Sequence, residues 1–137
     1  MLKGSCINPQ ILKTLSLCGH GDKVLIADGN YPLTSHISST ASNVFLGLSE
    51  GIPSVTQVLK VLSKEISVEE ARIMLPDNSV EEPEIYNEFK EILPNTKFEA
   101  LERYTFYKAC CDTQVKMGIS TGEKRLYANI LITIGTV

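Results

Sequence analysis

The sequence alternates short apolar runs with stretches whose apolar residues recur at helical spacing, and this alternation limits the folds open to the chain. The two clearest runs are 23–27 (Lys-Val-Leu-Ile-Ala) and 130–134 (Ile-Leu-Ile-Thr-Ile). A short apolar run bounded by turn residues is typical of a strand buried on both faces. Strands that alternate with helices predict an α/β domain, with a largely parallel central sheet flanked by helices in the manner of a Rossmann fold.

The other predicted elements follow the same two patterns. Strands are expected at 43–48, 70–75, 97–101 and 115–120, and helices at 9–18, 53–62, 82–93 and 103–113. Asn8 and Pro9 form a typical helix start, and Gly19 is a natural helix end. The segment 70–75 is ambiguous, because the Glu-Glu-Ala-Arg sequence at 69–72 also favours helix, and 115–120 is a weak strand pattern. The chain has 137 residues, so we expect residues 1–137 to form one domain.

Composition excludes several classes of function. The net charge is −3 and the 13 Lys and Arg residues are scattered, whereas a nucleic-acid surface needs a dense basic stripe. No apolar run approaches the roughly 20 residues that span a bilayer. The first ten residues lack the apolar stretch of a signal peptide, so we expect a cytoplasmic protein without a membrane partner. There is no GxGxxG, P-loop, HExxH or GxSxG motif.

The four cysteines are Cys6, Cys18, Cys110 and Cys111. None belongs to a CxxC pair, and a tetrahedral metal site normally shows paired ligands a few residues apart. With only two histidines in the chain, buried reduced thiols are the preferred interpretation, and no metal is expected. The second histidine, His36, has no obvious acidic or cysteine partner and is interpreted as a solvated loop residue.

His20 and Asp28 flank the first predicted strand, and Asn30 follows close behind. Polar residues just past strand ends collect at the ligand crevice of an open α/β sheet, and a histidine can act there as acid or base. A five-residue strand spans roughly 17 Å, so His20 and Asp28 share a site only if His20 leans over the sheet edge or if sites form between subunits. The alternative is a surface histidine near a helix end and an aspartate that caps a turn, which the spacing alone favours.

Two further segments carry candidate site residues. Arg103 and the aromatic residues of 104–107 open a predicted helix and can stack on a sugar and donate hydrogen bonds to it. Tyr127 and Asn129 lie two residues apart before a buried strand and offer a hydroxyl and an amide. The alternatives are aromatic packing in the core for the first segment and an ordinary loop for the second.

Together these segments resemble the ribose pyranase and fucose mutarotase family almost from end to end. The stretches that carry the resemblance are 19–32, 51–62, 102–109 and 121–132. The resemblance implies a compact Rossmann-type domain, a free monosaccharide as substrate and no cofactor. It also implies a homo-oligomer, commonly a ring-shaped decamer, with sites at subunit boundaries.

The same resemblance assigns roles to residues. His20 takes the place of the family's proton donor, and Tyr127 is a second candidate proton carrier. The implied sugar-binding residues are Asp28, Arg103, Tyr127, Ala128 and Asn129. Ring opening requires one proton to reach the ring oxygen and another to leave the anomeric hydroxyl, so positioned acids and bases suffice for it.

The preferred sugar is the point on which the sequence gives mixed signs. Arg103 and the Gly-His-Gly-Asp form of 19–22 resemble fucose mutarotases, and the histidine that ribose pyranases carry near Tyr107 is missing. The stretch 51–71 looks more like the ribose branch. We therefore expect an L-fucose mutarotase, with a D-ribose pyranase as the alternative and a sugar-binding module without turnover as a third hypothesis.

Overall fold

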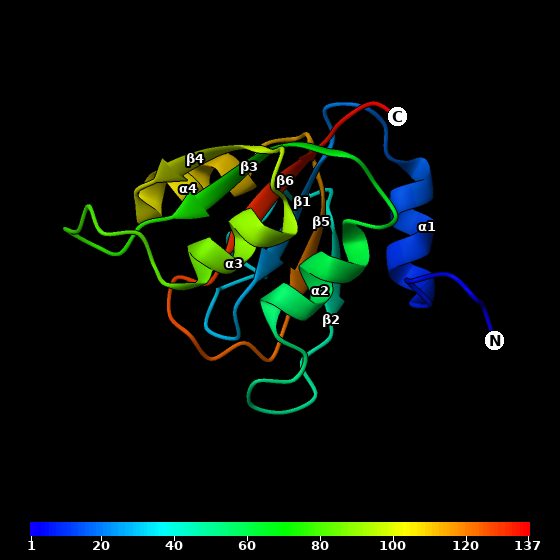
Figure 1. Ribbon diagram of the computed structural model, residues 1–137, viewed down its shortest axis with the longest axis horizontal. Helices are drawn as coiled ribbons and strands as arrows, with labels where there is room; N and C mark the ends of the chain where they lie inside the picture. The colour runs from blue at the N-terminus through cyan, green and yellow to red at the C-terminus, as the bar shows by residue number, and fades with distance from the viewer.

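A computed structural model describes residues 1–137, which form one six-stranded sheet covered by helices on both faces (Figure 1). The strands lie in the order β2-β5-β1-β6-β3-β4. Their bounds are β1 Lys23–Ala27, β2 Ser42–Phe45, β3 Val68–Met74, β4 Lys97–Leu101, β5 Val115–Ser120 and β6 Ile130–Ile134. The helices are α1 Pro9–Leu17, α2 Val55–Leu62, α3 Ile85–Ile92 and α4 Arg103–Cys110. The predicted α/β class is confirmed.

Strand β6 is the one strand that runs against the others. β1 pairs in parallel with β5, β5 with β2, and β3 with β4, whereas β6 is antiparallel to both β1 and β3. Ile130, at the start of β6, lies opposite Ile26 of β1 and Ile73 of β3. Residues just before β6 therefore lie beside the carboxyl ends of β1 and β3. This arrangement brings distant parts of the chain together.

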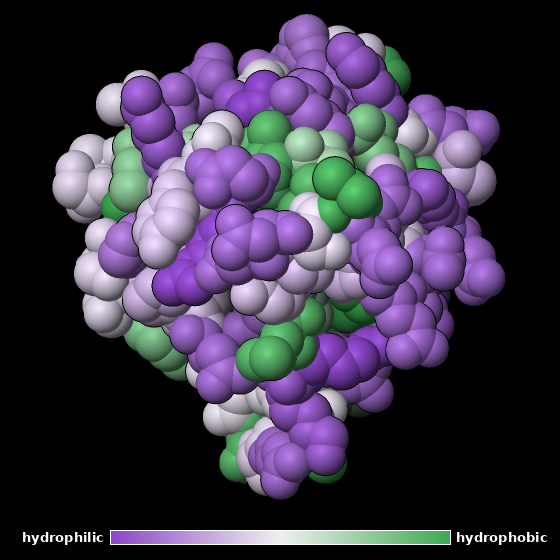
Figure 2. Space-filling model, turned by 90° about the vertical axis from the view of Figure 1, so that its left-hand side faces the viewer, coloured by the Kyte–Doolittle hydropathy of each residue, from purple (hydrophilic) through white to green (hydrophobic).

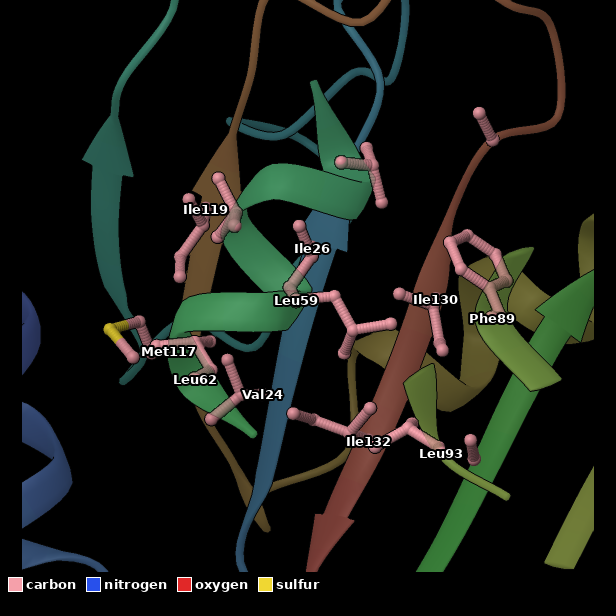
Figure 3. Close-up of a cluster of buried hydrophobic side chains, with 14 of the residues drawn as sticks. Val24, Ile26, Leu59, Leu62, Phe89, Leu93, Met117, Ile119, Ile130 and Ile132 are labelled. Carbon is pink, nitrogen blue, oxygen red and sulfur yellow. The ribbon is translucent and has the colours of Figure 1, made fainter. Parts of the chain in front are cut away.

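The alternation of side chains along β1 divides the core into two layers. Val24 and Ile26 belong to a cluster of 21 buried residues, while Leu25 and Ala27 belong to a separate cluster of nine. The larger cluster lies beneath α2 and α3, and Figure 3 shows Leu59 of α2 among side chains of the central strands. Helix α4 covers the other face, behind the sheet in Figure 1. Strands buried on both faces explain why β1 and β6 are almost uniformly apolar.

Helix ends depart from the sequence prediction by a few residues. Asn8 caps α1 by accepting a bond from the Ile11 amide, as predicted, but Cys18 is the C-cap and Gly19 lies beyond the helix. Pro53 does not open α2, because Ser54 is the N-cap and forms a reciprocal capping box with Gln57. The helix predicted over 82–93 covers only 85–92, and the helix predicted to end at residue 113 ends at Cys110.

The edge formed by β4 is hydrophilic. Lys97 and Glu99 are exposed on it, and Figure 2, which views this side of the molecule, shows a mostly polar surface with small hydrophobic patches. Charged side chains on an edge strand discourage unwanted pairing with another chain.

The prediction that the cysteines are buried is only partly correct. Cys6 and Cys110 are buried and Cys18 is half-buried, but Cys111 is exposed. Cys111 is the C-cap of α4 and directly follows the buried Cys110. None of the four helices has the length and apolarity needed to cross a membrane.

The packing of the core predicts that replacing two different leucines will have very different effects on the free energy of unfolding. Leu59 is fully buried beneath α2, whereas Leu17 at the end of α1 is 78% exposed. Leu59→Ala should lower the free energy of unfolding by about 2–5 kcal/mol because it leaves a cavity. The control Leu17→Ala should change it by less than about 0.5 kcal/mol. Urea unfolding of both variants measures this, and equal effects would contradict the described core.

Candidate active site

A cavity of about 200 Å³ lies at the carboxyl ends of β1 and β3, where the loop before β6 meets the start of α4. It is smaller than the roughly 300–1,000 Å³ clefts that take drug-sized ligands. Its lining consists of Asp28, Asn30, Tyr31, Met74, Arg103, Tyr107, Leu126, Tyr127 and Asn129. The lining has one carboxylate and no histidine or cysteine, so its polar groups suit hydroxyl groups better than a metal ion.

Asp28 and Asn129 form the floor of this cavity through two hydrogen bonds. The Asp28 backbone N–H donates to Asn129 Oδ1 over 2.8 Å, and Asn129 Nδ2 donates to Asp28 Oδ2 over 3.1 Å. Asp28 Oδ1 accepts a further bond from the Asn30 backbone N–H. Both side chains are almost completely buried. The pairing fixes the orientation of both groups before any ligand arrives.

Burial raises the pKa of the Asp28 carboxyl. Hydrogen bonds from backbone N–H groups and from Asn129 act in the opposite direction, because they stabilise the charged form. The raised pKa means that ionisation of Asp28 weakens the fold. Its contribution to the free energy of unfolding is therefore largest at low pH and falls as the pH rises through the raised pKa.

The backbone of Tyr127 is unusual. Its φ angle is +59°, in the left-handed region that residues with a side chain seldom adopt. Such conformations cost about 1–3 kcal/mol and concentrate at functional sites. The turn places the half-buried Tyr127 ring on the cavity, whereas the Ala128 side chain is fully buried in the larger core cluster. Ala128 therefore contributes no side chain to the cavity and acts as the spacer between Tyr127 and Asn129.

Arg103, the first residue of α4, lies on the opposite side of the cavity. Its Nη1 donates to Asp77 Oδ2 over 2.8 Å, and its guanidinium carbon lies 5.3 Å from the Tyr104 ring centre and 5.7 Å from the Tyr107 ring centre. Its Nε is buried and has no partner. A buried donor without a partner is costly. Arg103 is also the only cationic side chain that lines the cavity.

The aromatic residues of α4 divide between the two interpretations that the sequence allowed. Tyr107 lines the cavity, Phe106 is fully buried in the core, and Tyr104 is 65% exposed. His36, predicted to be a solvated loop residue, is instead half-buried, with its ring centre 4.5 Å from that of Tyr107. Its Nδ1 lies 2.9 Å from the Ser35 hydroxyl. No local sequence pattern predicts this contact, because it depends on how the loop after β1 folds over α4.

Tyr31 lines the cavity but its hydroxyl is already engaged. The hydroxyl donates to the His36 carbonyl over 2.7 Å, and burial raises the pKa of Tyr31. Tyr31 therefore stays neutral and supports the cavity wall. The Tyr127 hydroxyl, by contrast, makes no such bond to the protein.

A buried ion pair supports the loop that carries Tyr127 and Asn129. Glu123 is 4% exposed and accepts two bonds of 3.0 Å from Arg125, which also contacts Glu88 of α3. Although burial alone would raise the pKa of Glu123, the bonds from Arg125 bring it below the usual value. The carboxylate therefore stays charged and ties the loop to α3. Spacing alone gave no signal for Glu88, which lies 37 residues from Arg125.

His20 is absent from this cavity. It lies in the turn between α1 and β1, at the top of Figure 1 beside the C-terminus, while the loop before β6 lies at the lower left. Its Nε2 is 2.9 Å from Glu69 Oε2 at the start of β3. This contact holds the imidazole at the amino end of β1. Within one subunit, His20 therefore does not lean over the sheet to reach Asp28.

The fold and the cavity together define a small α/β protein with a polar crevice at the carboxyl ends of its strands, the position at which such sheets bind ligands. The sequence pattern of the RbsD / FucU transport protein family matches residues 1–137. The chain belongs to this family, which confirms the resemblance predicted from the sequence.

Individual relatives agree with this assignment. The chain is 33% identical to a D-ribose pyranase of Clostridium perfringens, over 100% of this chain and 99% of the relative. It is similar to Bacillus subtilis RbsD complexed with D-ribose, with a TM-score of 0.85, 26% identity, and coverage of 100% and 99% of the two chains. A fucose mutarotase in complex with L-fucose from Streptococcus pneumoniae has a TM-score of 0.79 and 25% identity, over 96% of this chain and 94% of that one. The family therefore comprises pyranases and mutarotases, enzymes that interconvert forms of a sugar ring.

The raised pKa of Asp28 predicts how sugar binding depends on pH. The carboxylate accepts hydrogen bonds through both oxygens, and protonation removes part of that capacity. The affinity for a sugar placed in this cavity, with L-fucose as the probe, should therefore fall as the pH is lowered through a midpoint above the usual aspartate value. NMR titrations of the Asp28 carboxyl carbon and of fucose binding measure both midpoints. Asp28→Asn should show no such step, and a midpoint at or below the usual value would contradict the description.

Proposed function

We propose that this protein catalyses the opening and reclosing of a free monosaccharide ring, with L-fucose as its preferred substrate. The observation that carries the proposal is the convergence of Asp28, Arg103, Tyr127 and Asn129 on one small polar cavity. These residues come from three separate parts of the chain, the end of β1, the start of α4 and the loop before β6. Together they offer a carboxylate, a guanidinium, a phenol and an amide, which can both donate to and accept from sugar hydroxyls.

In the proposed reaction the chain's own groups move two protons. One group protonates the ring oxygen while another removes the proton from the anomeric hydroxyl, and the reverse transfers close the ring on the other face of C1. We assign the acid/base role to His20 and a second transfer to Tyr127. Asp28, Asn129 and Arg103 hold the hydroxyls, so the reacting atoms stay aligned.

His20 reaches the cavity in this scheme only from a second copy of the chain. It lies at the amino end of β1, bonded to Glu69, whereas Asp28 lies at the carboxyl end. Tyr104 and Leu126, at or near the cavity, are 65% and 66% exposed. Apolar side chains exposed at a polar site are consistent with cover by a neighbour. The homo-oligomer expected from the family resemblance, a decamer, provides such a neighbour.

A D-ribose pyranase is the second candidate. It is supported by the names of the relatives, since the D-ribose pyranase of Chloroflexus aggregans is also 31% identical over the whole chain. The cavity favours fucose, because Arg103 and Tyr107 line it and no histidine does. A sugar-binding module without turnover is the third candidate, and His20 argues against it because neutral hydroxyls can be held without an imidazole.

Replacing His20 tests the proposed chemistry. His20→Ala should slow anomer exchange by roughly 10²–10⁴-fold, the usual contribution of a general acid or base, and leave the fold intact. Exchange NMR on L-fucose and D-ribose measures it. The control is Lys116→Ala, since Lys116 lies at the same end of the sheet and pairs only loosely with Asp22, at 3.9 Å. Unchanged exchange in folded His20→Ala would remove His20 from the mechanism.

Replacing Arg103 tests the choice of sugar. Lysine keeps the charge but cannot reproduce the planar fork of donors. Arg103→Lys should weaken L-fucose turnover about tenfold, because an unpaired buried hydroxyl costs roughly 1–3 kcal/mol, and it should affect D-ribose much less. Both sugars are measured side by side on both proteins. Faster ribose than fucose exchange by the unaltered protein would instead favour the pyranase activity.

A further inference from the structure

Arg103 occupies a place in α4 that is unfavourable for a cation. It is the first residue of an eight-residue helix, and the amino end of a helix carries partial positive charge. Glu102, the N-cap, uses its carboxylate to accept bonds from the Tyr104 and Thr105 backbone N–H groups. The countercharge that bonds directly to the guanidinium is Asp77, at 2.8 Å from Nη1.

Asp77 comes from a turn after β3 that is fixed near the start of α4. The Leu75 N–H donates to the carbonyl of Leu101, the last residue of β4, over 2.8 Å. The Ser79 N–H donates to the Pro76 carbonyl over 3.2 Å. These bonds set the Asp77 carboxylate beside Arg103. Asp77 itself does not line the cavity.

The Tyr107 side chain also interacts with the Arg103 guanidinium, and Tyr107 and Asp77 together raise the pKa of Arg103. Tyr104 and Tyr107 lie 5.3 and 5.7 Å from the guanidinium carbon, and attraction to a ring face restrains the position of the charge more than the direction of each N–H. A hydrogen bond from Nη1 to a carboxylate sets the rotation of the planar fork. With Nη1 engaged, the buried Nε has no protein partner.

We propose that Asp77 is a positioning residue that holds Arg103 in the orientation that recognises the sugar and thereby determines sugar selectivity. The inference rests on the proposed function, since it concerns the same cavity. Asp77 bonds to Nη1 and Tyr107 interacts with the same guanidinium, so the donors that face the cavity keep a fixed direction toward sugar hydroxyls. A sugar that depends on Arg103 benefits from this preorganisation, because the side chain loses less conformational freedom on binding.

The test compares Asp77→Asn with a matched control on the same segment. Glu82 pairs with Lys90 of α3 at 3.7 Å and does not contact Arg103, and its side chain is 46% exposed against 40% for Asp77. Asp77→Asn, Asp77→Glu and Glu82→Gln are assayed by exchange NMR over a range of L-fucose and D-ribose concentrations. The Arg103 Nε–H signal, identified by its loss in Arg103→Lys, reports the orientation of the side chain without any sugar.

Asp77→Asn should raise the L-fucose concentration at half-maximal rate about two- to fivefold, the range expected for a partly exposed ion pair, with little change in kcat. D-ribose exchange should not change, and exchange of the Arg103 Nε hydrogen with water should accelerate. Asp77→Glu should restore most of the loss, and Glu82→Gln should match the unaltered protein.

Two failures are distinguishable. If the unaltered protein accelerates exchange of neither sugar, the proposed function is wrong and the selectivity role fails with it. If the unaltered protein is active but Asp77→Asn behaves like Glu82→Gln in both the sugar assay and the Nε signal, the inference about Asp77 alone is overturned. Equal losses on both sugars would also overturn it, since they would give Asp77 a general structural role.

Discussion

The two hydrogen bonds between Asp28 and Asn129 are the interaction on which the candidate site depends. It exists because β6 runs antiparallel between β1 and β3, so that a residue just before β6 meets a residue just after β1 although they lie 101 positions apart. A buried carboxylate is costly unless hydrogen bonds satisfy it. The same bonds that offset this cost also orient the two groups toward the cavity, so stability and preorganisation have one origin.

The loop before β6 shows how the surroundings maintain this arrangement. Tyr127 is held with a positive φ angle, and the ion pair between Glu123 and Arg125 ties the loop to α3. Backbone strain persists only when neighbouring contacts determine the conformation. The buried carboxylate of Glu123, the core packing of Ala128 and the bonds of Asn129 supply those contacts, which leaves the Tyr127 ring at the cavity.

The sequence predicted β1, β4, β5 and β6 with their observed bounds, whereas β2 and β3 begin and end earlier than predicted. The family resemblance grouped Asp28, Arg103, Tyr127 and Asn129 with His20, and the structure places the first four, but not His20, on one cavity. The direction of β6 could not be predicted from the sequence, since an apolar run has the same pattern in a parallel and an antiparallel strand. The observed helix ends differ from the predicted ones because helix caps depend on side-chain hydrogen bonds such as those between Ser54 and Gln57.

Contacts between residues from distant segments could not be predicted from the sequence either. Glu69 beside His20, Asp77 beside Arg103 and His36 beside Tyr107 are created by the folding of the chain, and nothing in their local sequence marks them. The separation of His20 from Asp28 was foreseen from strand length. The His20–Glu69 contact excludes one of the two explanations, that His20 leans over the sheet edge within one subunit. A site shared between subunits is the explanation that the proposed function adopts.

The central claim is that a complete site combines the cavity of one subunit with His20 of another. Co-expression of His20→Ala and Asp28→Asn chains with different tags, followed by isolation of mixed oligomers, tests it most directly. Each variant alone should be inactive, whereas mixed oligomers should recover a substantial fraction of anomer exchange, because some sites then join an intact cavity to an intact His20. Mixed oligomers as inactive as either parent would contradict the account.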